Sequence, residues 1–171
     1  MTRNAAVLVT GMSGVGKSTA LAGLAQRGYA TVDTDDGTWI EIVDGEPLWR
    51  ESLIDELLSR RRDGPLFVQG TVANQWRFYD RFDAVVLLTA PTDVVLDRVR
   101  RRTNNPFGKT AEERARILAD IAETEPLLRR SATHEVDTSR PLPEVIDALV
   151  DIAETPVTRA VPPPASAGSG S

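Results

Sequence analysis

The sequence predicts an α/β protein, built as a three-layer, doubly wound sheet of five parallel strands. Short apolar runs alternate with segments of helical periodicity along the chain, which is the order expected of strand–helix–strand units. A glycine-rich loop at residues 11–18 stands between the first apolar run and the first helical segment. The 171 residues are enough for one domain with a hydrophobic core.

Three of the expected strands lie in the first half of the chain. They cover residues 5–10, 29–32 and 65–70. The run at 65–70, like a later one at 84–90, is compact and apolar, which suits burial on both faces of a parallel sheet. A helix is expected over residues 17–26, with Gly28 at its carboxyl end. A second helix is expected over residues 48–62, because five apolar side chains share one face: Leu48, Leu53, Ile54, Leu57 and Leu58.

The second half of the chain completes the alternation. Thr110 and Glu113 have the spacing of a capping box, which predicts the start of a long helix. The expected elements are a strand at 84–90, helices at 93–102 and 110–130, a strand at 133–138 and a helix at 142–154. Residues 1–154 are therefore interpreted as one domain. Residues 155–171, rich in Pro, Ala, Gly and Ser, are expected to form a flexible tail.

Composition narrows the classes of function. The net charge of -5 provides no bulk attraction to nucleic acid or to an anionic membrane, and the basic run at residues 60–62 is interpreted as a solvated helix end. The chain has no cysteine and a single histidine, His134, which excludes thiolate metal sites and cysteine catalysis. No apolar run approaches the roughly 18 residues of a membrane span. The amino terminus lacks a signal-peptide pattern. We expect a cytoplasmic protein with no nucleic-acid or membrane partner.

The loop GMSGVGKS at residues 11–18 matches the pattern of a phosphate cradle. Its backbone N–H groups and the following helix N-terminus suit phosphate oxygens. In this pattern Lys17 neutralises phosphate oxygens, and the Ser18 hydroxyl is a ligand of Mg²⁺. ATP and Mg²⁺ are the expected cofactors. The expected ATP contacts in and beside the loop are Gly11, Met12, Ser13, Gly14, Val15, Gly16, Lys17, Ser18 and Thr19.

The position of the acidic residues favours a kinase over a hydrolytic switch or motor. The later apolar strands end in FVQG and LLTA, without the acid that usually ends such a strand in those proteins, and the guanine-reading motif N-K-x-D is absent. The acids instead follow the second strand, as Asp33 and Asp35. Polar clusters after the first three strands, at 11–18, 33–36 and 69–74, should meet at one edge of the sheet, where such folds bind ligands.

Three stretches carry a resemblance to a known family: GMSGVGKST, VDTDDGTWIE and EPLLRRSATHEVDTSR. They resemble the nucleoside monophosphate kinase-like P-loop group, and the shikimate kinases most closely, from about Val7 to Val150. The resemblance implies a five-stranded parallel sheet with a mobile lid at about residues 102–110. It also implies that Asp33 holds Mg²⁺ and that Asp35 contacts the acceptor hydroxyl, a catalytic role that phosphoryl transfer can use.

The same resemblance implies substrate contacts for Arg50, Gly70 and Arg129, with the two arginines clamping a carboxylate. Two departures argue against shikimate itself as the acceptor. Residues 69–71 read Gln-Gly-Thr where shikimate kinases have three glycines, and the segment RRRTNNPFGK replaces their lid motif. The wall of the acceptor pocket is therefore expected to differ from that of the family, with the amide of Gln69 and the hydroxyl of Thr71 able to hydrogen-bond a polar acceptor.

The segment DRVRRR, residues 97–102, resembles the start of the lid in adenylate kinases. That resemblance implies that Arg98 stacks on the base and that Arg102 approaches the transferring phosphoryl group as a catalytic cation, beside Lys17. The stretch DTSRP would then form the other side of the adenine pocket, with Arg140 as an ATP contact.

The leading hypothesis is an ATP- and Mg²⁺-dependent phosphotransferase that acts on a hydroxyl of a small polar metabolite, with anionic compounds among the candidates. A nucleoside monophosphate kinase and a non-catalytic ATP-binding regulatory domain are the alternatives. The acceptor's identity, the preference for ATP over GTP and the oligomeric state stay open.

Overall fold

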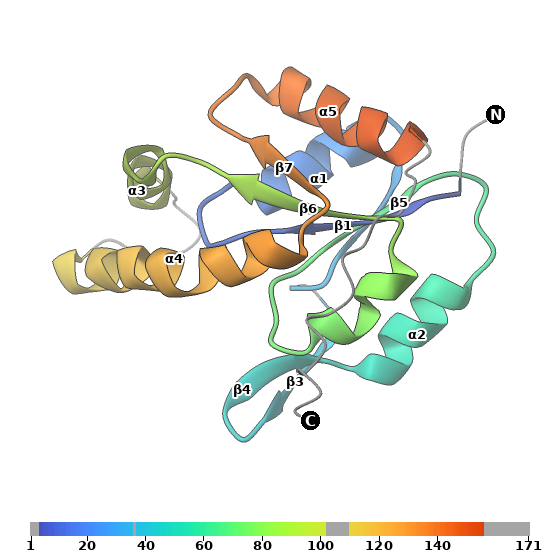
Figure 1. Cartoon of the computed structure of the whole chain (residues 1–171), viewed down its shortest axis with the longest axis horizontal. Coiled ribbons are helices and arrows are strands. Elements are labelled where there is room, and N and C mark those ends of the chain that lie inside the picture. The colour runs from blue at the N-terminus through green and yellow to red at the C-terminus, as the bar shows by residue number, and fades with distance from the viewer. Residues whose placement is uncertain (1–3, 36, 102–109, 156–171) are drawn as a thin grey trace, which may run out of the picture.

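A computed structural model describes residues 4–35, 37–101 and 110–155 of the chain. Its centre is a five-stranded sheet in which every neighbouring pair is parallel, in the order β2-β5-β1-β6-β7 (Figure 1). The strands are β1 (Ala6–Thr10), β2 (Ala30–Asp33), β5 (Leu66–Gln69), β6 (Ala84–Thr89) and β7 (His134–Asp137). This confirms the doubly wound parallel sheet and each of its five expected strands.

Helices cover the sheet on both faces. One face carries α1 and α5, and the other carries α2 and the 3₁₀ helix η1, which gives three layers (Figure 1). The helices are α1 (Lys17–Gln26), α2 (Glu51–Ser59), η1 (Gln75–Arg81), α3 (Thr92–Arg101), α4 (Ala111–Ser131) and α5 (Leu142–Glu154). Within the described ranges, no helix is both long and apolar enough to cross a bilayer.

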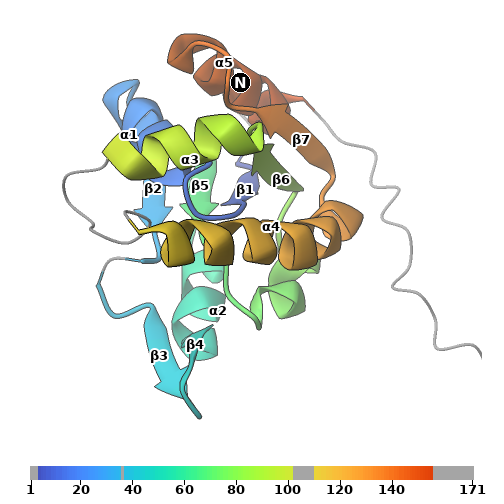
Figure 2. The same cartoon turned by 90° about the vertical axis from the view of Figure 1, so that its left-hand side faces the viewer.

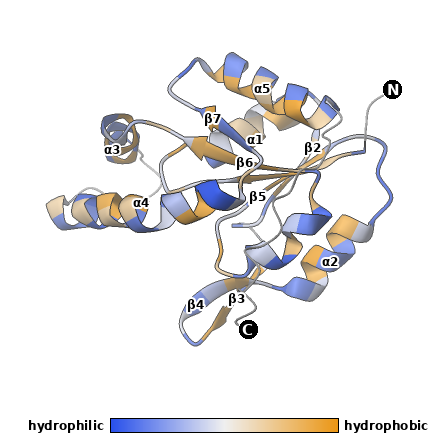
Figure 3. Cartoon of the chain, viewed as in Figure 1, coloured by the Kyte–Doolittle hydropathy of each residue, from blue (hydrophilic) through white to orange (hydrophobic). Residues whose placement is uncertain are grey.

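Strand β1 shows how the sequence divides the core into two halves. Its residues are all buried, and successive side chains of a strand point to opposite faces. Val7 and Val9 pack in the cluster that includes α1 and α5 residues, whereas Ala6 and Leu8 pack with α2 and η1. Figure 3 shows the inner strands β5 and β6 largely in the hydrophobic colour, as expected for strands covered on both faces.

One expected helix was partly wrong. Residues 48–62 do not form one helix, because Leu48 and Trp49 belong to strand β4 (Glu46–Trp49), which pairs antiparallel with β3 (Ile40–Val43). The two strands are joined by Asp44 and Gly45, both at positive φ (51° and 79°). An Asp-Gly pair is a strong signal for a two-residue hairpin turn, so the hairpin could have been found from the sequence.

The start of α4 agrees with the expected capping box. The Thr110 hydroxyl accepts a hydrogen bond from the Glu113 amide at 3.1 Å and donates one to its carboxylate at 2.9 Å. The expected lid at 102–110 lies outside the described residues apart from Thr110, and the expected tail lies outside them from residue 156 onward.

The carboxyl ends of the five strands form one edge of the sheet. Figure 2 views the molecule from this side and shows the loop after β1 lying between α3 and α4. The last residues of the strands at this edge include Thr10, Asp33, Gln69 and Asp137. The side chains that follow from β1, β2 and β5 therefore converge on one region, in line with the expected meeting of the polar clusters.

Candidate active site

The phosphate-binding loop is shaped by glycines that other residues could not replace. Gly14 has a φ of +86°, and a Cβ there would lie 2.9 Å from a methyl carbon of Val95 and 3.0 Å from one of Val99. Gly16, at φ +96°, is the N-cap of α1. The loop therefore packs tightly against α3 while α1 starts directly behind it, and the N-terminus of a helix favours bound phosphate.

Lys17 lies over the loop that precedes it. Its Nζ donates hydrogen bonds to the carbonyl oxygens of Gly11, at 2.6 Å, and Met12, at 3.1 Å. These bonds hold the ammonium group above the cradle. A single positive charge at this position suits the phosphate groups of a nucleotide.

Ser18 and Asp33 meet at the start of α1. The Ser18 hydroxyl donates a hydrogen bond to Oδ2 of Asp33 at 3.1 Å. A hydroxyl and a carboxylate are oxygen donors of the kind that Mg²⁺ prefers, and Mg²⁺ in proteins keeps several waters besides one or two carboxylates. The pair fits the expected magnesium site, with Ser18 and Asp33 as the residues that would hold the ion and the ion itself neutralising phosphate charge.

Asp35 lies beside Asp33 on the turn that follows β2. The amide of Asp35 donates to Oδ1 of Asp33 at 3.0 Å, and Asp35 is exposed. Gln69, at the end of the neighbouring strand β5, donates from Nε2 to Oδ2 of Asp35 at 3.0 Å and also to Oδ1 of Asp33. The two carboxylates thus converge on one amide group.

Thr71 connects β5 to the phosphate loop. Its hydroxyl donates to the carbonyl oxygen of Gly11 at 2.6 Å and lies 3.1 Å from the hydroxyl of Thr10. Thr71 also lines a cavity between the β3–β4 hairpin, η1 and α4. Its side chain therefore forms the boundary between the phosphate loop and that cavity.

Arg98 joins the phosphate loop to the segment that follows β7. The guanidinium donates to the carbonyl oxygen of Val15 at 3.1 Å and to the Thr138 hydroxyl at 2.9 Å, and also to the Thr138 carbonyl oxygen. The Thr138 hydroxyl donates in turn to the carbonyl of Val15 at 2.6 Å. Arg98 therefore lies at the side of the loop where the base was expected, with its hydrogen bonds directed to the backbone; its stacking on a base stays a prediction.

A cavity of about 510 Å³ lies on the other side of Thr71. Its walls come from the β3–β4 hairpin, the segment from Thr71 through η1, and the second half of α4. Trp76 and Leu127, which are 62% and 57% exposed, both line it. Burial raises the pKa of the Tyr79 hydroxyl in the same wall. Of the described residues that line this acceptor-side cavity, Glu46 alone is charged.

The two arginines expected to clamp a carboxylate contact protein carboxylates. Arg50 lies 3.5 Å from Glu41, and Arg129 lies 2.9 Å from Glu125 and 3.2 Å from Glu135. The hydrogen bonds to Glu135, and secondly to Glu125, raise the pKa of Arg129. Neither arginine is among the described residues that line the acceptor-side cavity, and their clamp role stays a prediction.

Gly70 is buried for a packing reason. A Cβ on Gly70 would lie 2.7 Å from Oγ1 of Thr34 and 2.9 Å from a ring carbon of Trp49. The fully buried Trp49 donates from its indole nitrogen to Thr34 at 3.0 Å and fills this space. The glycine is therefore needed for close packing, and its expected contact with substrate stays a prediction. Arg102 lies outside the described residues.

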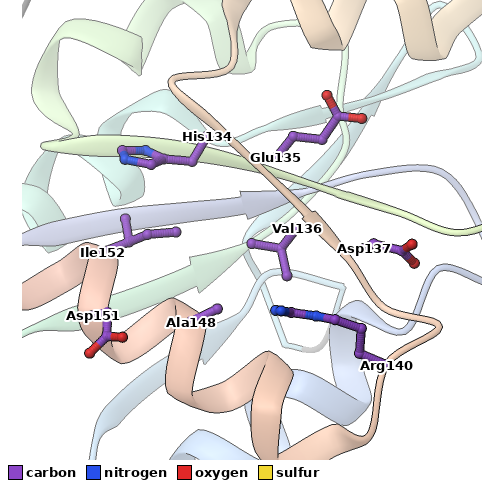
Figure 4. Close-up of a pocket in the computed structure, with 8 residues that line it drawn as sticks. All are labelled: His134, Glu135, Val136, Asp137, Arg140, Ala148, Asp151 and Ile152. Atoms are coloured by element: carbon purple, nitrogen blue, oxygen red, sulfur yellow. The ribbon is translucent and has the colours of Figure 1, made fainter.

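Arg140 lies in a groove of about 470 Å³ between β7, at the edge of the sheet, and α5. Figure 4 shows its side chain extending back from the loop toward Val136 and Ala148. In the same groove, burial lowers the pKa of His134, and the hydrogen bonds that the Ser139 hydroxyl and amide donate lower the pKa of Asp137. The expected ATP contact of Arg140 stays a prediction.

Sequence reasoning missed the roles of three polar side chains. Gln69 and Thr71 were expected in the acceptor wall. Thr71 lines the cavity and also bonds the phosphate loop, whereas Gln69 bonds Asp33 and Asp35 instead. Asn74, which is buried, pairs with both backbone groups of Trp49, at 2.9 and 3.0 Å. For Gln69 and Thr71 the sequence did carry a signal, because residues 69–71 read Gln-Gly-Thr where shikimate kinases have three glycines. No pattern in the sequence indicated the role of Asn74.

Comparisons with known proteins agree with this arrangement. A family model described as an AAA domain matches residues 7–119. Shikimate kinase from Halorhodospira halophila is 32% identical over 151 residues, which cover 78% of this chain and 84% of that protein. Shikimate kinase from Rhodopseudomonas palustris is 32% identical over 165 residues, 85% of this chain and 81% of that protein. Among solved structures, the Acinetobacter baumannii shikimate kinase in complex with shikimate has a TM-score of 0.61 at 19% identity, over 86% of this chain and 92% of that one.

Proposed function

The chain belongs to the AAA domain family of P-loop proteins and to the shikimate kinase-like kinases, and on this premise we propose which phosphoryl transfer it performs. The proposed reaction moves the γ-phosphoryl group of ATP, in the presence of Mg²⁺, to a hydroxyl group of a small metabolite. The protein itself is a P-loop kinase acting on a small molecule. The donor, the ion and the acceptor are the parts that the proposal adds.

The observation that carries the proposal is the placement of Asp33 and Asp35 beside the phosphate loop. Asp33 is hydrogen-bonded to Ser18, the residue that would share the ion with it, and Asp35 lies next to Asp33 on the same turn. A carboxylate at this place can orient the acceptor hydroxyl and accept its proton. In this proposal Lys17 neutralises phosphate charge and Asp35 receives the hydroxyl proton. Arg102, the expected lid cation, would stabilise the transferring group.

We further propose that the acceptor binds in the acceptor-side cavity and carries an uncharged, partly apolar face. The cavity adjoins the phosphate loop at Thr71. It presents exposed Trp76 and Leu127 and, among its described lining, no positive side chain. Apolar walls with a few hydrogen-bonding groups are typical of small-molecule sites. Arg50 and Arg129, the arginines expected to bind an anionic acceptor, are paired with protein carboxylates.

An ATP-consumption screen with product mass tests the proposal. Four groups of compounds are compared: neutral polyols and sugars, nucleosides, sugar and ring acids that include shikimate, and nucleoside monophosphates. The expected result is a singly phosphorylated product from a neutral hydroxyl compound, with Mg²⁺ required. Turnover of a monophosphate would establish a nucleoside monophosphate kinase instead. ATP binding without any phosphorylated product across all four groups would favour a regulatory ATP-binding domain.

A variant of Trp76 tests whether the acceptor binds in the cavity. Trp76→Ala should raise the KM for the acceptor about tenfold or more while leaving the KM for ATP within about twofold, since the indole is exposed in the cavity wall. Arg81→Ala is a matched control, because Arg81 lies on η1 with Trp76 and its ion pair with Asp55 lies outside the cavity lining. An acceptor KM unchanged in Trp76→Ala would place the acceptor elsewhere.

A further inference from the structure

Gln69 ends strand β5 between the phosphate loop and the acidic turn. Its side chain is fully buried, and its backbone lies in register with Asp33 of β2 on one side and Val9 of β1 on the other. The carbonyl oxygen of Gln69 accepts hydrogen bonds from the amide of Thr34, at 3.2 Å, and from the Thr34 hydroxyl, at 2.8 Å. The backbone of Gln69 is therefore hydrogen-bonded to the acidic turn, independently of its side chain.

The amide group of Gln69 faces the two carboxylates with its NH₂ end. Nε2 donates to Asp33 and to Oδ2 of Asp35, so both of its hydrogens are used. Ionised carboxylates only accept hydrogen bonds, so chemistry requires this orientation of the amide. The opposite end, Oε1, is buried and accepts no hydrogen bond from the described part of the chain.

An amide held in this way is unfavourable for stability on its own. A buried acceptor without a partner lowers the stability of the fold, and an apolar side chain of the same size would remove that penalty. The carboxylates have other partners, because Asp33 also accepts from Ser18 and from the Asp35 amide, and Asp35 is exposed. The contacts of Gln69 thus contribute more to the placement of the two acids than to the fold.

We propose that Gln69 is a positioning residue of the phosphoryl transfer. Its NH₂ group donates a hydrogen bond to each carboxylate and so holds Asp33 and Asp35 close together despite the repulsion between their charges. The position of Asp33, which would bind the metal, is thereby fixed relative to that of Asp35, which would contact the acceptor. Asp35 stands on an exposed turn, where its side chain would otherwise turn toward water. The inference rests on the proposed roles of the two acids, and Gln69 itself touches neither ATP nor acceptor in it.

The test replaces Gln69 by methionine, which keeps the length and volume of the side chain and removes both donors. Gln69→Met should lower kcat about a hundredfold, the loss that a misplacement of about 1 Å can produce. At saturating Mg²⁺ the KM for ATP should stay within about threefold, because the phosphate loop is unchanged. The melting temperature should equal or exceed that of the wild type, since the unpaired buried oxygen is gone.

Asn74→Leu is the matched control. Asn74 is also a buried amide side chain, but it bonds both backbone groups of Trp49 and the Glu51 carboxylate, and it lies outside the cavity lining. Its replacement should lower the melting temperature, as expected for a structural amide. If Gln69→Met keeps the wild-type kcat, or if its kcat and melting temperature fall together as in a structural variant, the positioning role is overturned.

A binding measurement separates this inference from the proposed reaction. The rise in melting temperature on adding ADP is measured with and without Mg²⁺, which needs no acceptor. The part of the rise that depends on Mg²⁺ should shrink in Gln69→Met, because Asp33 loses its fixed orientation, and an undiminished rise would contradict the inference. If the wild type phosphorylates no acceptor, the proposed reaction fails, and this measurement still decides the role of Gln69.

Discussion

The Ser18 hydroxyl donates a hydrogen bond to the Asp33 carboxylate, with 3.1 Å between Oγ and Oδ2. The two residues are 15 positions apart: Ser18 lies in the first turn of α1, and Asp33 is the last residue of β2. They meet because parallel strands carry the chain back to the same edge of the sheet before each new segment begins. This contact joins the phosphate loop to the acidic turn.

Asp33→Asn should increase the Mg²⁺ concentration needed for activity about tenfold or more. Asparagine keeps the size of the side chain and loses the charge that attracts the ion. The measurement is the rate at fixed ATP over a Mg²⁺ titration. Asp63→Asn is the control, because Asp63 is exposed just before β5, at the opposite edge of the sheet. An unchanged Mg²⁺ requirement in Asp33→Asn would remove Asp33 from the ion site.

Asp35→Asn should keep ATP binding and lower the transfer rate by about 10²- to 10⁴-fold, the usual contribution of a general base. Asp35 is exposed, so the fold should tolerate the change. ATP affinity is measured by calorimetry, and transfer is measured by product formation at saturating acceptor. A transfer rate equal to that of the wild type would show that Asp35 does not receive the hydroxyl proton.

Lys17→Ala should lower nucleotide-dependent turnover at least about a hundredfold, because one fixed cation at the phosphate groups is lost. The Lys17 ammonium lies against the carbonyl oxygens of Gly11 and Met12, within the cradle. The control is Arg27→Ala, since Arg27 follows α1 and pairs with Asp147 on the surface. Turnover is compared at equal ATP; similar losses in both variants would point to a general effect on α1.

Asn74→Ala should lower the free energy of unfolding by about 1–3 kcal/mol, because it leaves buried backbone groups without partners. The Asn74 amide accepts from the Trp49 N–H and donates to the Trp49 carbonyl, which holds β4 against η1. Denaturant titration measures the change. Asn74→Asp should not restore stability, because its second oxygen would face the Trp49 carbonyl and Glu51. Wild-type stability in either variant would contradict this assignment.

His134 should make the fold less stable in mild acid. Burial lowers its pKa in the folded protein, so the unfolded chain takes up the proton first, near its ordinary pKa of about 6.5. Stability from this group is therefore present above about pH 6.5 and declines as the pH falls below that value. His134→Asn should reduce the difference in melting temperature between pH 7.5 and 5.5. His134 is the only histidine, so an unchanged difference would exclude this cause.

Much of the fold could be predicted because its signals are local. The three central strands β1, β5 and β6 are short, largely apolar runs, and the helices at 17–26 and 142–154 have the bounds that their patterns predicted. The hairpin was missed, although Asp44 and Gly45 mark its turn, because the apolar periodicity from Leu48 onward was assigned to a helix. In the interpretation of this segment, the apolar periodicity was given more weight than the Asp-Gly turn signal.

The sequence by itself determined the parallel sheet, the phosphate loop and the edge at which Asp33 and Asp35 stand, because apolar runs, glycines and strand ends act over a few neighbouring residues. Which side chains meet across strands became clear from the three-dimensional structure alone. In it Gln69, expected in the wall of the acceptor pocket, bonds the two acids, and Arg50 and Arg129 pair with protein carboxylates. Such contacts depend on strand register and on the distance between elements, which no local pattern in one chain encodes.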